Sequence, residues 1–123
     1  MSSAKTNYGV VISSNSWGVD AGSGYYGAYS SYTDDWDVSI RNTDMLVFKA
    51  AGNDQGYGPY DTLDTDSTAK NMVTVGALTD SGGMTSFSSW GPCDDGRVKP
   101  DLCANGNSLY STYPTGTARC TEL

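Results

Sequence analysis

The chain has 123 residues, of which 37% are hydrophobic and 17% are charged, and its formal net charge is −7. This length predicts a single domain, and so small an apolar fraction predicts a fold that is marginal alone or belongs to a larger unit. The negative charge argues against nucleic acid and anionic membranes as partners. No run of about 18 apolar residues is present that would span a membrane.

The chain contains no histidine, which removes every histidine-based nucleophile pair and zinc ligand from its own side chains. Its acidic residues are nearly all aspartate, a residue that favours turns and helix caps, so we expect a loop-rich chain. If the protein is secreted, we expect at most one intrachain disulfide, with no preferred pairing, and a free buried thiol is an equal interpretation for Cys103. The three cysteines are Cys93, Cys103 and Cys120.

The first predicted element is a short strand at residues 8–13, a β-branched run that ends at serine and asparagine. Residues 18–32 have neither helical nor strand periodicity and predict a loop rich in glycine, serine and tyrosine. Packing of a surface loop explains its tyrosines more simply than an aromatic platform for a ligand does. These tyrosines are Tyr25, Tyr26, Tyr29 and Tyr32.

A helix is predicted at residues 33–42, with Thr33 as its N-cap and Trp36 and Ile40 on one face. Three of its first residues are acidic, which suits the positive end of the helix dipole. A calcium site is the alternative explanation for these carboxylates, and the dipole is the simpler one. The three residues are Asp34, Asp35 and Asp37.

Two nearly continuous apolar runs, residues 45–51 and 72–78, predict further strands. Because such runs are typical of strands buried on both faces, we expect a parallel sheet and a right-handed strand–helix–strand unit. Residues 55–69 predict a polar loop, in which Asp61–Asp66 lacks the spacing of a calcium-binding loop and is interpreted as solvated. The predicted fold class is α/β, with a parallel, doubly wound sheet.

One glycine-rich motif is a false lead. Residues Gly22–Gly27 match the pattern G-x-G-x-x-G of dinucleotide-binding proteins. That site needs a strand directly before the first glycine and a helix opening at the third, whereas here the predicted strand ends well upstream. We therefore do not expect a nucleotide cofactor.

Four segments, taken in order, carry a specific resemblance. Together they resemble the subtilisin-like serine proteases, or subtilases (peptidase family S8), over roughly residues 8–112. The segments are VISSNSWG at 11–18, AAGND at 50–54, AKNMVTVGA at 69–77, and FSSWGP at 87–92 continuing to GRVKPD at 96–101. The resemblance implies a subtilisin-type α/β fold and an activity in peptide-bond hydrolysis.

The resemblance also implies roles for individual residues. Ser16, Trp17 and Gly18 match the strand edge that pairs with extended substrate, and Ala50, Ala51 and Gly52 match the facing wall of the primary specificity pocket. Asn53 matches the oxyanion-hole asparagine. Its position is physically reasonable, because open α/β sheets bind ligands at the carboxyl ends of their strands and an amide is a neutral donor. A simple strand-ending turn is the alternative interpretation of Ala50–Asp54.

The sequence also departs from the family pattern. The catalytic Asp and His segments of subtilases precede the matched region, the Gly-Thr-Ser-Met-Ala nucleophile segment follows it, and Ala104-Asn105-Gly106 replaces the usual Ala-Pro-Gly. We therefore expect residues 1–123 to be a single partial catalytic domain that is inactive alone. The resemblance implies polypeptide substrates, a secreted whole protein, and structural calcium at most as a cofactor.

A different class of function is the alternative. A subtilase-derived module without catalysis would bind or assemble by pairing its exposed strand edges with a partner chain. An incomplete sheet with unpaired edges also favours self-association.

Overall fold

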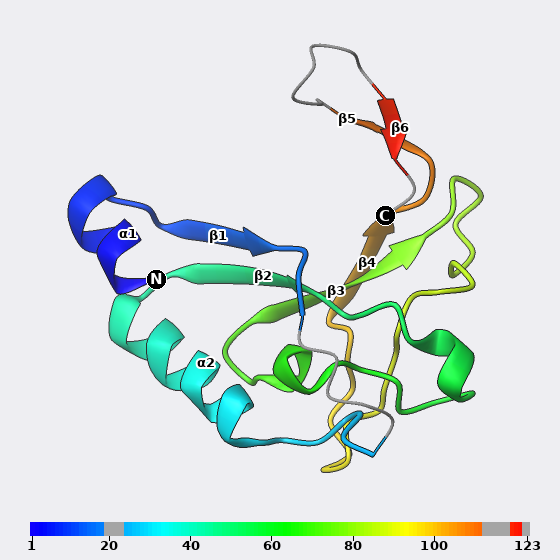
Figure 1. Cartoon of the computed structure of the whole chain (residues 1–123), viewed down its shortest axis with the longest axis horizontal. Coiled ribbons are helices and arrows are strands. Elements are labelled where there is room, and N and C mark those ends of the chain that lie inside the picture. Colours follow the sequence, from blue (N-terminus) through cyan, green and yellow to red (C-terminus); the bar gives the residue numbers. More distant parts are fainter. Residues whose placement is uncertain (19–23, 112–118, 122–123) are drawn as a thin grey trace.

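The structure, a computed structural model, describes residues 1–18, 24–111 and 119–121, and its centre is a four-stranded parallel sheet (Figure 1). The strand order follows the chain, β1-β2-β3-β4, and a separate antiparallel pair, β5-β6, lies near the C-terminus. The strands are β1 (Ile12–Asn15), β2 (Leu46–Ala50), β3 (Val73–Leu78), β4 (Leu102–Asn105), β5 (Leu109–Ser111) and β6 (Arg119–Thr121). The predicted α/β class and its parallel sheet are confirmed. The glycine-rich stretch Gly22–Gly27 begins outside the described residues.

The described residues also form helical elements. They are α1 (Ser2–Tyr8), α2 (Ser31–Thr43) and two 3₁₀ turns, η1 (Gln55–Tyr57) and η2 (Thr65–Thr68), and α2 is the longest of them. Within the described part of the chain, no helix has the length and apolar character needed to cross a membrane.

The N-terminal strand was predicted to begin too early. Residues 2–8 form α1, which ends at Gly9 with a left-handed φ of 66°, and β1 begins only at Ile12. Glycine adopts this conformation without steric cost and is therefore a common residue at helix ends. The β-branched run that follows it led to the prediction of a strand from residue 8. None of the residues of α1 is buried, and for this reason the hydrophobic pattern carried no signal for it.

The predicted helix at 33–42 is confirmed as α2, with a different N-cap. Ser30 is the cap, and Thr33 occupies the third helical position, where its hydroxyl accepts a hydrogen bond from the Ser30 backbone N–H at 3.1 Å. Asp37 is buried and accepts hydrogen bonds from the backbone N–H groups of Lys70 (3.0 Å) and Asn71 (2.7 Å). This carboxylate therefore ties α2 to the loop before β3, a role beyond the dipole complementarity predicted for it.

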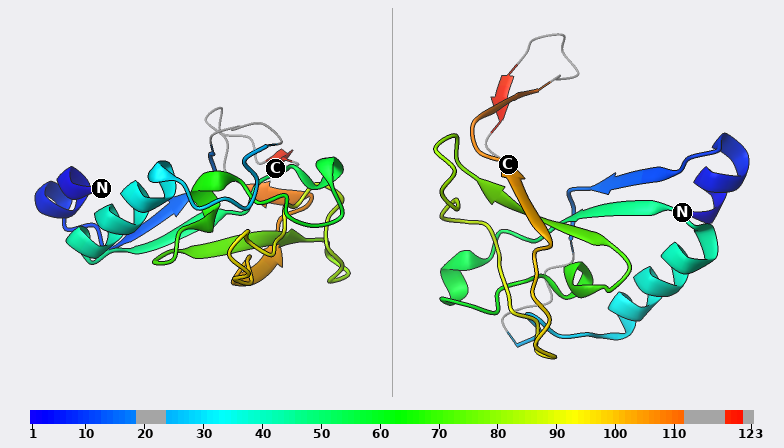
Figure 2. Two further views of the ribbon diagram at one scale, coloured as in Figure 1. Left: turned by 90° about the horizontal axis from the view of Figure 1, so that it is seen from below. Right: turned by 180° about the vertical axis from the view of Figure 1, so that it is seen from behind.

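One face of the sheet is covered by α2 and the segment around η2 (Figure 2). The apolar cluster beneath them contains the predicted pair Trp36 and Ile40, with Trp36 partly buried. The rest of this cluster consists of Val10, Met45, Val47, Ala69 and Met72. A second, smaller cluster comprises Ala51, Leu63 and Cys93.

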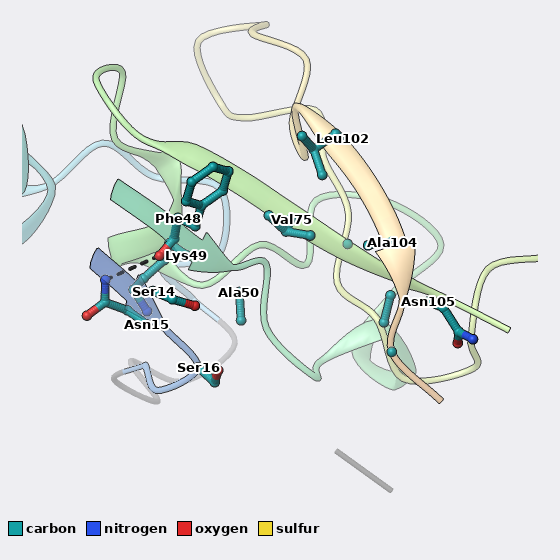
Figure 3. A pocket seen from close by; sticks show the side chains of 13 residues that line it. Ser14, Asn15, Ser16, Phe48, Lys49, Ala50, Val75, Leu102, Ala104 and Asn105 are labelled. Atoms are coloured by element: carbon teal, nitrogen blue, oxygen red, sulfur yellow. Dashed lines mark hydrogen bonds between the residues drawn. The ribbon is translucent and has the colours of Figure 1, made fainter. Parts of the chain in front are cut away.

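The opposite face of the sheet is uncovered, contrary to the expectation of strands buried on both faces. Side chains alternate along a strand, so β2 buries Val47 and Lys49 while Leu46 stays 46% exposed. The strand register places Leu46 beside Ile12, and Val75 beside Leu102. We call this surface the open face; its apolar members include Ile12, Leu46, Phe48, Val75, Leu102 and Ala104. A hollow of about 420 Å³ lies over it, and Figure 3 shows the side chains that line this hollow.

The segment at 61–66, interpreted as a solvated loop, is mostly buried. Residues 62, 63 and 65–69 are buried, and within 61–66 only Asp61 is exposed. Hydroxyl groups make this burial possible: Thr68 donates to the carbonyl of Ala28 at 2.9 Å, and Thr74 donates to that of Ser67 at 2.6 Å. Buried polar groups that are hydrogen-bonded cost little, so a core built on threonine and serine explains how so small an apolar fraction yields an ordered fold.

Candidate functional site

The carboxyl ends of β1 and β2 border a groove of about 220 Å³. We call it the Asn53 groove. It is lined by Ser16, Trp17, Gly18, Ala50, Gly52, Asn53, Asp54 and Asp64. Six of the seven predicted site residues are therefore brought together, from segments more than thirty positions apart in the sequence. The seventh, Ala51, is buried behind the groove in the small cluster with Leu63 and Cys93.

The larger hollow on the open face is a different place. It shares Ser16 and Ala50 with the Asn53 groove but is otherwise lined mainly by residues of the four strands β1, β2, β3 and β4. The smaller groove is bordered by Asn53 and by two rims, residues 16–18 on one side and residues 50–52 on the other. We therefore assign the candidate site to the Asn53 groove.

Asn53 follows directly after β2, and its side chain is exposed at the groove. The backbone on either side is firmly held. The Ala51 N–H donates to the carbonyl of Val75 at 3.0 Å, and the Asp54 N–H donates to Oγ of Ser89 at 2.9 Å. The amide of Asn53 is thus presented on a fixed turn, as electrostatic stabilisation of a developing charge requires.

Gly52 makes this turn possible. Its φ is +114°, and a Cβ at this position would lie 2.8 Å from Cγ of Asp64 and 2.8 Å from Oγ of Ser89. A larger residue would meet both a backbone penalty and a steric one. The requirement for glycine here matches its place in the Ala50–Asp54 motif.

The opposite rim is held by a buried lysine. Lys49 is 1% exposed. Its ammonium group donates to the backbone carbonyl of Trp17 and pairs with Oδ2 of Asp66 at 3.0 Å. The same Nζ lies 5.1 Å from the ring centroid of Trp17 and 5.9 Å from that of Trp36, within the range of cation–π attraction. Lys49 therefore links β2, the β1 rim and the η2 segment.

Asp64 was not predicted as a site residue, yet it lines the groove. Burial raises the pKa of Asp64 to about 7, helped by its hydrogen bond with Asp54 and by the charges of Asp54 and Asp66, while Lys49 acts in the opposite direction. This carboxyl group is thus one whose charge changes near neutral pH.

Lys49, Asp64 and Asp66 were not predicted from the sequence as residues of the site. A lysine inside an otherwise apolar strand was the available signal, because a buried ammonium group requires an acidic partner. Nothing in the sequence pattern identified which of the many aspartates that partner would be.

Comparison with known proteins identifies the family. The model of the subtilase family of peptidases (Peptidase S8) matches residues 1–123, the full chain. The chain belongs to the subtilase family. The resemblance to subtilases that was predicted from four ordered sequence segments is thereby confirmed.

The chain spans only a small part of the length of the curated relatives that it matches. The chain is 30% identical over 125 residues to the serine protease/ABC transporter B family protein tagD of Dictyostelium discoideum, covering 94% of the chain and 6% of that protein. It is 33% identical over 73 residues to Subtilisin DY of Bacillus licheniformis, covering 59% of the chain and 24% of that protein.

Solved structures of proteases share the fold. A mutant of the protease domain of PatA superimposes with a TM-score of 0.70 at 23% identity, over 96% of this chain and 39% of that one. The prenylagaramide maturation protease PagA gives 0.68 at 22% identity, over 94% and 38%. The parallel sheet described above is therefore that of subtilisin-type protease domains.

Proposed function

We propose that this chain is the middle portion of a subtilisin-like serine endopeptidase, in which Asn53 donates a hydrogen bond to the oxyanion that forms during peptide-bond cleavage. The observation that carries this proposal is the Asn53 groove. It sets an exposed amide on a fixed turn at the carboxyl end of a parallel strand, between the two segments whose sequences match the substrate-binding rims.

The rims would hold the substrate. Ser16, Trp17 and Gly18 follow β1, and Ala50 and Gly52 lie across from them. An extended peptide placed between them would have its backbone flanked by two stretches of main chain, the geometry by which strand addition gives affinity. Fixing the scissile carbonyl in this way places it within reach of a pre-oriented donor.

The chemistry of the remaining steps would come from outside these residues. Acyl transfer in this family uses a serine nucleophile and a histidine base, and the sequence has no histidine. We therefore propose that the 123-residue chain alone hydrolyses no peptide. Purified chain should give no turnover of a casein substrate and no labelling by a serine-directed fluorophosphonate probe. Activity that co-purifies with the chain and disappears with that probe would contradict this proposal.

The role of Asn53 is tested in a longer polypeptide that also supplies the nucleophile and base segments. There, Asn53→Ala should lower kcat on the order of 10²–10³-fold, the loss known for removal of an oxyanion-hole donor in subtilisin. KM should change little, because the amide is expected to act on the transition state rather than on the bound substrate. Asn42→Ala, an exposed asparagine of α2, is the matched control and should leave kcat unchanged. Equal kcat values for the Asn53 variant and the wild type would overturn the assignment.

A second candidate function is a binding module without catalysis. Its support is the sheet order, which leaves β1 and β4 as edge strands paired on one side only within the described residues. Edge strands recruit partner strands by backbone pairing. If an extended polypeptide that carries both catalytic segments binds peptides but never reacts with the fluorophosphonate probe, this second function is favoured.

A further inference from the structure

The Asn53 groove carries an excess of negative charge. Of the eight described residues that line it, two are acidic, Asp54 and Asp64, and none is a lysine or arginine. Lys49 is the nearby cation, and it is already committed to Asp66 and to the carbonyl of Trp17. Three carboxyl groups are therefore set against one ammonium group.

The carboxyl group of Asp64 extends between the two rims. A Cβ built on Gly18 would lie 2.5 Å from Oδ2 of Asp64, and one built on Gly52 would lie 2.9 Å from Oδ1. Each oxygen thus faces the glycine of one rim. Because both positions are glycines, the approach to this carboxylate from the groove is not blocked by side chains at these two positions.

Asp66 adds a second, independent observation. Its side chain is almost fully buried, and within the described residues Oδ1 accepts no hydrogen bond, whereas Oδ2 pairs with Lys49. The Cβ position of Gly18 lies 3.6 Å from this unpartnered oxygen. A buried carboxylate oxygen without a hydrogen-bond donor is energetically costly. Oδ1 of Asp66 is directed at Gly18, the same glycine that Oδ2 of Asp64 faces.

A cation from outside would balance this excess of negative charge. Placing positive charge beside Asp64 would favour its ionised form and relieve its repulsion from Asp54 and Asp66. A guanidinium group suits a carboxylate especially well, because it donates two parallel hydrogen bonds. A metal ion is the less favoured occupant, since among the described residues no group of three or more potential ligands is arranged to hold one.

We propose that the Asn53 groove binds a basic side chain, arginine or lysine, of the polypeptide substrate, with Asp64 as its main partner and Asp54 and Asp66 adding negative charge. This inference rests on the proposed function, in that the groove is taken to be where substrate lies. It adds the class of side chain that the groove selects.

The test uses the 123-residue chain and two matched peptides, acetyl-Ala-Ala-Arg-amide and the same peptide with citrulline, which keeps the shape of arginine and lacks its charge. Binding is followed by the amide resonances of Gly18, Gly52 and Asn53 in NMR spectra. At about pH 8, where Asp64 is mostly ionised, the arginine peptide should bind at least about tenfold more tightly than the citrulline peptide. The ratio should fall at about pH 5, where Asp64 is protonated.

Variants locate the effect. Asp64→Asn keeps the shape of the side chain and should reduce the ratio to near one, and Asp54→Asn should reduce it partly. Asp61→Asn is the control: it removes the same charge from an exposed aspartate of the same loop, outside the groove, and should leave the ratio unchanged. Circular dichroism spectra verify that each variant is folded; if Asp64→Asn unfolds, Asp54→Asn and the pH dependence decide.

The outcomes separate this inference from the proposed function. Equal binding of both peptides at the groove resonances would overturn the charge preference and leave the substrate groove standing. Absence of any shift at those resonances with either peptide, at millimolar concentration, would overturn both. A third outcome concerns metal ions. If the wild-type chain binds both peptides equally, and calcium chloride shifts the same resonances and displaces the arginine peptide, the groove is a metal-ion site and the inference is overturned.

Discussion

The Nζ atom of Lys49 lies 3.0 Å from Oδ2 of Asp66, and their side chains are 0% and 3% exposed. The pair joins the middle of the parallel sheet to the η2 segment, and the ammonium group also holds the carbonyl of Trp17. The rim of the Asn53 groove is therefore positioned by a charge buried in the core. In this way the stability of the fold and the geometry of the groove depend on one side chain.

Lys49→Met should destabilise the chain strongly. Removing one partner of a buried ion pair leaves an uncompensated charge, at a cost of about 3–5 kcal/mol in the free energy of unfolding. Urea denaturation followed by tryptophan fluorescence measures the change. Lys70→Met, at an exposed lysine that lies over the ring of Tyr29, is the control and should cost about 1 kcal/mol or less. A loss of similar size in both variants would contradict the assigned role of Lys49.

Gly52→Ala should damage the turn that carries Asn53. The backbone is in a left-handed region, and the new methyl group would lie within 2.8 Å of Asp64 and Ser89. The expected loss is about 1–3 kcal/mol in the free energy of unfolding. Gly56→Ala, a few residues away with no atom within 4 Å of the added Cβ, should be close to neutral. Equal midpoints of thermal unfolding for the Gly52 and Gly56 variants would disprove the steric argument.

The parts of the fold that sequence predicted were those with a strong local signal. The runs at 45–51 and 72–78 were apolar enough to be read as strands regardless of context, and the helix at 33–42 had a cap, acidic first turn and an i, i+4 apolar pair. By contrast, α1 buries no side chain and β4 consists of four exposed residues. Elements that gain little from burial leave little periodicity in the sequence.

In the candidate site, the two rims and Asn53 were predicted from the resemblance to subtilases, because the matching motifs occur in the family's order and spacing along the chain. The acidic residues of the groove could not be found in this way, because their role depends on a loop folding back beneath Gly18 and Gly52. The burial of residues 62–69 rests on hydroxyl groups bonded to distant carbonyls. Such tertiary hydrogen bonds have no sequence period, and a polar segment therefore suggested a solvated loop.

The stability of the chain should depend on pH through Asp64. Its folded-state pKa of about 7 lies above the ordinary value of 3.8, so between these pH values the folded chain holds a proton that the unfolded chain has lost. The contribution of Asp64 to the free energy of unfolding is therefore full below about pH 4, declines as the pH rises to about 7, and is constant above that. Relative to wild type, Asp64→Asn should become progressively more stable across this interval in urea denaturation. A difference between the two proteins that is independent of pH would contradict the raised pKa.

The thiols should differ sharply in reactivity. Cys93 and Cys103 are both free; Cys93 is buried and Cys103 is exposed, so the buried-thiol interpretation of Cys103 was wrong. The side chain of Cys120 lies outside the described residues. Burial raises the pKa of the Cys93 thiol, although Arg97 opposes the shift, and a smaller thiolate fraction slows its reaction. With a chromogenic disulfide reagent, the Cys103→Ser variant should lose a fast phase, while Cys93 should react only on unfolding. A fast phase that survives in that variant and is lost in Cys93→Ser would reverse the assignment.

The open face makes the folding equilibrium of this chain sensitive to its surroundings. Side chains such as Ile12, Leu46 and Leu102 are 56%, 46% and 44% exposed in the folded state, and a molecule that covers them without binding the unfolded chain raises the free energy of unfolding by mass action. A second copy of the chain that set its own open face against this one would act in this way. The midpoint of unfolding therefore rises with the concentration of any such species, and stabilities of variants are comparable only when protein concentration and solvent composition are held constant.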